Sequence, residues 1–194
     1  MKKLLGTLLV LALAPLAAAI EGCTERDKCR IDSSQAFFDV EGLHFTAQQR
    51  GQLVGAGESV AAADIRLVIE LQARYYSQNR ALSTWLPAAV ACPPTPIPGY
   101  KGTSEVLDSV VVRCVYAYDA AHPGGAAVND LLLTEEDAQP LPAAPARNTQ
   151  PALYPQGLRL RQAPAQPGLQ QFVVRYRLTN GEIYTARTPV FTLR

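Results

Sequence analysis

The chain has 194 residues, with 18 Lys or Arg and 17 Asp or Glu, so its formal net charge at pH 7 is +1. A nearly neutral chain has no global electrostatic reason to bind nucleic acid or an anionic lipid surface. Its length is sufficient for one domain with its own hydrophobic core.

The first 22 residues have the composition of a secretory signal peptide. Lys2 and Lys3 precede an apolar run over residues 4–20, and small residues stand near its end. A transmembrane anchor is the alternative, but the run is short for a span, contains Pro15 and has no stop-transfer charges after it. We therefore expect export.

Two processing routes fit the end of this segment. The small residues around Ala19 permit cleavage after that position. Residues 20–23, Ile-Glu-Gly-Cys, resemble the lipobox of bacterial lipoproteins, with Glu21 as a departure from the uncharged residue usual there. The lipobox is favoured, so Cys23 is expected to carry acyl chains that hold the protein at a membrane of the bacterial envelope, the outer membrane being favoured. Release into the periplasm or medium is the alternative.

Four cysteines in an exported chain indicate disulfides. If Cys23 is acylated, Cys29, Cys92 and Cys114 remain, and one thiol stays unpaired. If Cys23 is not acylated, two bridges with three possible connectivities can form. A zinc site is disfavoured, because the cysteines are scattered and the chain has only two histidines.

The first half of the mature chain predicts two long strands. Residues 23–35 are polar and charged at their start and are expected to be a tether to a single domain over 36–194. Residues 36–49 form the first expected strand, with a bulge at Gly42, and the glycine-rich stretch 49–58 is expected to be a loop. Residues 64–76 alternate apolar and polar side chains, which favours a strand over the rival helix.

The middle of the chain is irregular until one strongly β-branched segment. Residues 81–92 are expected to form an irregular strand, and the prolines of 93–98 to form a stiff connector rather than a ligand for a partner domain. The stretch that begins at Ser104 predicts a long strand with Val110, Val112, Cys114 and Tyr116 on one face. The turn at 122–125 ends it, and a short helical turn or strand edge follows over 126–133.

The last part combines a proline-rich excursion over 138–167 with the clearest hairpin of the chain. Residues 157–162 are the one strand-like piece within the excursion. Composition alone does not decide whether the excursion is ordered over the sandwich or mobile. Alternating runs on both sides of Asn180-Gly181 predict a hairpin with a type I′ turn, and residues 188–193 can add a last strand. About seven strands with little helix predict an all-β, antiparallel sandwich that is immunoglobulin-like in broad architecture.

Several short motifs together resemble a family of small envelope lipoproteins of unknown function from Bacteroidetes-type bacteria. They are Gly22-Cys23, Cys29, Ala91-Cys92-Pro93-Pro94, Gly99-Tyr100-Lys101-Gly102, the strand at 108–119, His122-Pro123-Gly124-Gly125, Asn129-Asp130-Leu131 and Thr188-Pro189-Val190. The resemblance covers most of the mature chain and implies export and a β-rich domain, but no activity or catalytic residue. It also implies a disulfide between Cys29 and Cys92, with Cys114 left over.

The residues that could carry chemistry are few. Only His44 and His122 could act as a histidine base, and no nucleophile motif accompanies them, so we expect no enzyme and no cofactor. Carboxylates over 119–137 could hold Ca²⁺, with Asp119 and Asp130 as first candidates, but solvated turn carboxylates are the favoured interpretation. The aromatic residues that could bind a ligand are headed by Trp85, Tyr100 and Tyr118, although packing is the favoured role for such residues.

The sequence thus predicts an exported, lipid-anchored envelope protein with a non-catalytic structural or binding role. Its expected partners are membrane lipid and an unidentified envelope protein or glycan. The alternative is a secreted or surface module that binds carbohydrate or peptide through its tyrosines, and a hydrolase is the weakest alternative.

Overall fold

The computed structural model describes residues 35–77 and 97–194, and these residues form an all-β structure. The strands are β1 (Phe37–Gln49), β2 (Gln52–Leu53), β3 (Ser59–Val60), β4 (Ile65–Tyr76), β5 (Leu107–Cys114), β6 (Leu132–Thr134), β7 (Gln156–Leu160), β8 (Gly168–Gln170), β9 (Phe172–Leu178), β10 (Ile183–Arg187) and β11 (Phe191–Leu193). Short 3₁₀ turns precede β4 (η2, Ala62–Asp64) and β6 (η3, Asn129–Leu131). The predicted signal peptide, Cys23, Cys29, Trp85 and Cys92 lie outside the described residues.

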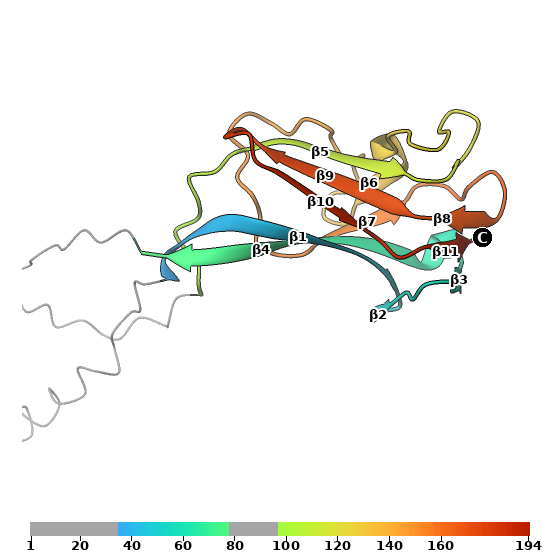
Figure 1. Ribbon diagram of the computed structural model, residues 1–194, viewed down its shortest axis with the longest axis horizontal. Helices are drawn as coiled ribbons and strands as arrows, with labels where there is room; N and C mark the ends of the chain where they lie inside the picture. The colour runs from blue at the N-terminus through green and yellow to red at the C-terminus, as the bar shows by residue number, and fades with distance from the viewer. Residues whose placement is uncertain (1–34, 78–96) are drawn as a thin grey trace, which may run out of the picture.

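The strands form two facing layers and a smaller third sheet (Figure 1). The larger layer has the order β2-β1-β4-β7-β6, and the opposite layer has the order β10-β9-β5. The third sheet, β3-β11-β8, includes one parallel pair, β3 with β11, whereas the other pairs are antiparallel. The prediction of an antiparallel β-sandwich with little helix is confirmed. The structure has more strands than the seven expected, because strands of two or three residues leave no periodic pattern in the sequence.

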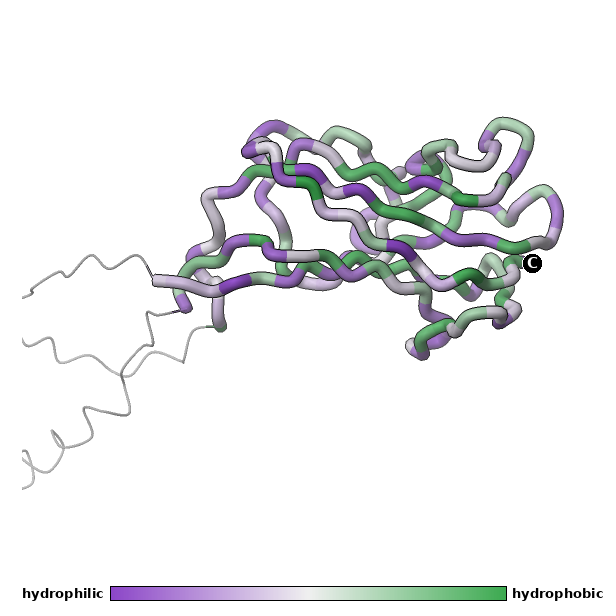
Figure 2. The backbone as a smooth tube through the Cα atoms, in the orientation of Figure 1, coloured by the Kyte–Doolittle hydropathy of each residue, from purple (hydrophilic) through white to green (hydrophobic). Residues whose placement is uncertain are grey.

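The long hairpin-like pair β1 and β4 forms as the alternation predicts. Twelve residue pairs join the two strands, from Phe37 opposite Tyr76 to Gln49 opposite Ile65. The apolar parity of β4 faces the core, where Leu67 and Ile69 are buried, while Glu70 on the other parity is exposed. Apolar residues therefore alternate with hydrophilic ones along these strands (Figure 2).

The predicted bulge in β1 is present, and it joins the two layers. The register shifts between Val40 and Gly42, which interrupts the ladder with β4. The Val40 backbone N–H then donates to Glu105 Oε2 at 2.8 Å, and its carbonyl accepts from the Tyr184 hydroxyl at 2.6 Å. Backbone groups at the irregularity are thus satisfied by side chains from outside the sheet.

The core lies between the layers and is centred on β5 and β9. Val110, Val112 and Cys114 of β5 are buried, as their shared parity predicts, and they pair in register with Tyr176, Val174 and Phe172 of β9. The strand ends at Cys114, earlier than expected. Beyond it Tyr116 is 39 % exposed, so the alternation does not continue to the turn at 122–125.

The segment after that turn crosses from one layer to the other. The Val128 N–H donates to the Val112 carbonyl at 2.8 Å, so the chain runs beside β5 before η3 and β6 take it into the larger sheet. The Asn129 side chain fixes the crossing, because its amide oxygen accepts from Val112 N–H and its amide nitrogen donates to the carbonyls of Val110 and Leu141. For residues 126–133 either a helical turn or a strand edge was expected. The structure has a short helical turn, η3, followed by a strand, β6.

The proline-rich residues 138–167 are ordered over the open edge of β5. Backbone N–H groups of Leu107 and Val110 donate to the carbonyls of Thr149 and Ala143, and Leu141 is 7 % exposed. The strand-like piece expected within this segment is β7, which lies between β4 and β6 in the larger sheet. This segment therefore covers one side of the sandwich and does not extend away from it.

The hairpin of β9 and β10 is confirmed, but its predicted turn type is wrong. Leu178 pairs with Glu182, which leaves a loop of three residues, 179–181, where a type I′ turn has two. Gly181 alone in this loop has a positive φ, of 96°. The glycine accordingly supplies the left-handed residue that closes a three-residue hairpin loop.

Candidate functional site

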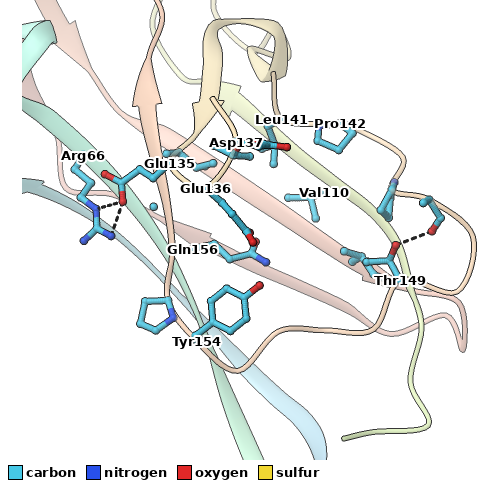
Figure 3. Close-up of a pocket in the computed structure, with 17 residues that line it drawn as sticks. Arg66, Val110, Glu135, Glu136, Asp137, Leu141, Pro142, Thr149, Tyr154 and Gln156 are labelled. Carbon is cyan, nitrogen blue, oxygen red and sulfur yellow. Dashed lines mark hydrogen bonds and ion pairs between the residues drawn. The ribbon is translucent and has the colours of Figure 1, made fainter. Parts of the chain in front are cut away.

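A pocket of about 630 Å³ opens where the proline-rich segment crosses the gap between the layers (Figure 3). Its lining comes from β4, β5, the residues after β6, the proline-rich segment and β7. The lining residues are Arg66, Leu107, Val110, Thr134, Glu135, Glu136, Asp137, Leu141, Pro142, Pro145, Ala146, Thr149, Tyr154, Pro155, Gln156, Gly157 and Leu158.

The inner wall of the pocket is apolar and continuous with the core. Val110, Leu141 and Leu158 are buried, with exposed fractions of 3 %, 7 % and 1 %. Prolines and the ring of Tyr154, which is 62 % exposed, form the outer wall. Such a wall can bury the apolar body of a ligand without rearrangement, because its backbone is held by a sheet on each side.

One edge of the pocket carries an ion-paired carboxylate. Arg66 Nε donates to Glu135 Oε2 at 2.7 Å, its Nη2 lies 2.6 Å from the same oxygen, and Arg159 Nε donates to Oε1 at 3.1 Å. The hydrogen bond from Arg66 and the charge beside it hold the pKa of Glu135 below its ordinary value. Glycine at 157 leaves room for this pair, because a Cβ there would overlap the Glu135 carboxylate and lie 2.7 Å from Arg66 Nη2.

Asp137, two residues after Glu135 in the chain, closes the turn after β6. Its Oδ1 accepts from the Thr134 hydroxyl and from the Gln139 backbone N–H, the latter at 3.1 Å. These hydrogen bonds, the one from Thr134 first, lower the pKa of Asp137. Asp137 is therefore an ionised structural group of the pocket rim.

Glu136, between these two carboxylates, has a different environment. Among the described residues it takes part in no side-chain hydrogen bond or ion pair within the distances that define them. Its side chain points into the pocket toward Gln156, on the side where the Tyr154 ring stands (Figure 3). It is the one carboxylate of the pocket that is left available for a ligand.

The carboxylates of residues 119–137, considered above as possible Ca²⁺ ligands, are divided between two places. Asp119 and Asp130 lie on either side of His122, with Nδ1 2.7 Å from Asp119 Oδ1 and Nε2 3.2 Å from Asp130 Oδ2. The hydrogen bond with Asp119 raises the pKa of His122 and lowers that of Asp119. Both ring nitrogens are engaged, and no cluster among residues 35–77 and 97–194 has the ligands for a metal ion. Asp119 and Asp130 therefore both contact the His122 imidazole.

Of the aromatic residues proposed for ligand binding, Tyr100 and Tyr118 lie in the described part of the chain, and these two have different environments. Tyr118 is 2 % exposed, packs against Phe172 at 6.4 Å between ring centroids and donates its hydroxyl to the Gln162 carbonyl, so it cannot contact a ligand at the surface. Tyr100 is 47 % exposed and lies beside Lys101 and Phe37, in the connection that precedes β5. A shared platform of Tyr100 and Tyr118 is thus excluded by the burial of one of them.

The histidines and the described cysteine do not form a nucleophilic centre. His44 Nε2 lies 2.7 Å from the Gln72 amide on the exposed face of the larger sheet. The Cys114 thiol is free and buried, its pKa is raised by burial, and its partners are backbone carbonyls. In the described part of the chain no thiol or hydroxyl lies within hydrogen-bond distance of either imidazole.

No protein-family model, curated protein or solved structure matches this chain significantly. The resemblance to envelope lipoproteins accordingly stays a prediction from its short motifs. Among the residues that the structure describes, no helix is long and apolar enough to span a membrane.

The pocket could not be foreseen from local sequence. Arg66 lies on the parity of β4 that reads as a solvated face, and Tyr154 lies in a proline-rich stretch without a pattern. Glu136 belongs to a run of turn carboxylates, for which solvation was the favoured interpretation. The three meet only because β7 pairs with β4 and β6, and no periodic signal encodes that arrangement.

Proposed function

We propose that this protein is an exported lipoprotein of a bacterial cell envelope that binds a small ligand with an apolar body. Acylated Cys23 would hold it at a membrane, and the pocket between the layers would receive the ligand. The single observation that carries the binding role is the pocket itself. Its volume of about 630 Å³ falls in the range of roughly 300–1,000 Å³ that is usual for small-molecule sites.

The chemistry of the pocket supports binding over catalysis. Neither histidine of the chain lines it. Glu135 and Asp137 have lowered pKa values, whereas a general acid at neutral pH needs a raised one. The hydroxyl of Thr149 is committed to the Ala146 carbonyl at 2.7 Å. The weakest alternative, a hydrolase, therefore gains no support here.

Intact mass spectrometry of the processed protein tests the anchor. We expect a chain that begins at Cys23 and carries acyl chains, recovered with the membranes. A soluble chain that begins at Ile20 and carries no acyl chain would contradict the anchor. It would make the protein a secreted binding module with the same pocket.

Methyl NMR tests the pocket. We expect hexanol to shift the methyl signals of Leu141 and Leu158 in a saturable manner, in the full mature chain carrying Cys23→Ser so that no acyl chain competes. Ala146→Trp should abolish the shifts, because Ala146 is an exposed residue of the pocket rim. Ala144→Trp is the matched control, because Ala144 is exposed on the same segment outside the lining. Unchanged binding in Ala146→Trp would contradict the proposed site.

A further inference from the structure

We propose that the pocket selects a small aliphatic amine, and that Glu136 is the residue that pairs with the ammonium group. This inference rests on the proposed binding function and names the class of ligand. It follows from the balance of charge in the lining, from the partners of each charged group and from the position of Glu136.

The lining has an excess of negative charge. Glu135, Glu136 and Asp137 face a single lining cation, Arg66. An anionic ligand would therefore meet like charge at the rim, where Glu136 and Asp137 are exposed. A neutral ligand would gain only the apolar contacts, whereas a cation would gain both.

The charged groups differ in whether they are free to act. Arg66 is committed to Glu135, with N–O distances of 2.6 and 2.7 Å, and Arg159 engages the second oxygen of the same carboxylate. Asp137 holds the turn through Thr134 and Gln139. Recruiting any of these groups to a ligand would break an existing contact.

Glu136 can bind a cation without such a loss. Its side chain points into the pocket, and no hydrogen bond or ion pair in the described residues engages it (Figure 3). The ring of Tyr154 lines the pocket on the same side and adds apolar surface there. A primary ammonium on an alkyl stem matches this site, because the stem can lie along Leu141 and Leu158 while the head remains at the rim.

Three probes of equal chain length separate charge from apolar contact. We would titrate the full mature chain carrying Cys23→Ser with hexylammonium, hexanol and hexanoate and follow the methyl signals of Leu141 and Leu158. A partly exposed ion pair contributes up to about 1 kcal/mol, so hexylammonium should bind about fivefold more tightly than hexanol. Hexanoate should bind more weakly than hexanol, and the preference should shrink as salt is added.

Glu136→Gln assigns the effect to one residue. The variant keeps the size of the side chain, and since Glu136 has no partner among the described residues the fold should be unaffected. It should bind hexylammonium and hexanol equally, with the affinity for hexanol unchanged. Glu70→Gln is the matched control, because Glu70 is an exposed carboxylate of β4 outside the pocket and should keep the preference for the amine.

The outcomes separate this inference from the function on which it rests. Equal affinities for hexylammonium and hexanol in the unmodified pocket would overturn the amine proposal and leave the pocket as a site for apolar ligands. A preference for the amine that survives in Glu136→Gln would overturn the assignment of the ammonium group to Glu136. If none of the three probes shifts the pocket methyls, the binding function itself is wrong, and this inference with it.

Discussion

The protein has two clusters of acidic and basic side chains, and their comparison shows what makes a polar group available for binding. At the turn after β5, Asp119 and Asp130 occupy both nitrogens of His122. At the pocket, Glu135 is engaged by two guanidinium groups, yet its neighbour Glu136 has no partner among the described residues. The two clusters use similar residues, but only the second leaves a charge free beside an apolar cavity.

The difference comes from how each cluster is built. Asp119 and His122 lie three residues apart in one turn, where Asp119 also accepts from the backbone N–H groups of Ala121 and His122. A local turn of this kind satisfies its own polar groups. The pocket cluster instead unites β4, β7 and the turn after β6, so its shape depends on the packing of separate strands.

The largest effect on the free energy of unfolding is expected at Asn129, which lies between the His122 cluster and the pocket. Its side chain holds Val110 and Val112 of β5 and the carbonyl of Leu141 in the pocket wall, and Asp130 follows it directly. Asn129→Ala should leave buried backbone groups unsatisfied and lower the free energy of unfolding by about 3 kcal/mol. Urea unfolding measures this, and Gln52→Ala, at an exposed residue of β2, should change it by less than about 0.5 kcal/mol. A loss below about 1 kcal/mol in Asn129→Ala would show that the crossing of the layers does not depend on this side chain.

A smaller loss in the free energy of unfolding is expected from a substitution at Gly157. The structural change should be confined to the pocket region. A methyl group at this position would collide with Glu135 and Arg66, so their ion pair must move. We expect Gly157→Ala to cost about 2 kcal/mol and to weaken hexanol binding. Gly168→Ala is the control, because a Cβ there meets only the Gln166 carbonyl oxygen at 3.9 Å. Equal stability of the two variants would mean that the ion pair can be rearranged at little cost.

The sequence predicted the fold where a period of two is long enough to see. The strands β1, β4, β5 and β9 and the C-terminal hairpin follow directly from alternation and from Asn180-Gly181. The turn type was wrong because the same dipeptide serves two-residue and three-residue loops, and register decides between them. Strands of two or three residues, such as β2 and β3, are held by tertiary pairing and leave no local pattern.

The candidate site was much less accessible to sequence reasoning. Tyr118 looked like a possible ligand-binding residue, but it is a core residue whose hydroxyl has a backbone partner. Asp119 and Asp130, named as the first candidates for a cation, lie on either side of His122, whose position between them no sequence pattern indicated. Glu136 could not be distinguished from Glu135 or Asp137 along the chain. Only the positions of Arg66, Arg159 and Thr134 in space separate the committed carboxylates from the free one.

Adjacent glutamates in the pocket provide a direct test of this distinction. Glu135→Gln should lower the free energy of unfolding by about 1 kcal/mol, a value discounted for the exposure of Arg66 and Arg159. Glu136→Gln should change it by less than about 0.5 kcal/mol, because no group in residues 35–77 and 97–194 loses a partner. Urea unfolding of both variants under the same conditions makes the comparison. A loss in Glu136→Gln equal to that in Glu135→Gln would contradict the availability of Glu136.

The smallest effect on the free energy of unfolding is expected from a change of pH at the cluster of Asp119, His122 and Asp130. Its sign follows from the raised pKa of His122 and the lowered pKa of Asp119. The pKa of His122 is raised above 6.5, chiefly by its hydrogen bond with Asp119, so its stabilisation is complete below that pH and is lost as pH rises through the folded value. The pKa of Asp119 is lowered below 3.8, chiefly by the same bond, so its stabilisation is complete above that pH and is lost as pH falls through the folded value. The pair should therefore stabilise most between about pH 4 and 6.5.

NMR titration of the His122 ring checks this directly. Asp119→Asn should lower the pKa of His122 more than Asp130→Asn does, because Asp119 lies 2.7 Å from the ring and Asp130 lies 3.2 Å away with a side chain that is 67 % exposed. An unchanged His122 titration in Asp119→Asn would show that Asp119 does not hold the imidazole in its charged form. The closed cluster would then rest on the backbone hydrogen bonds that Asp119 accepts from Ala121 and His122, and not on its contact with the imidazole ring.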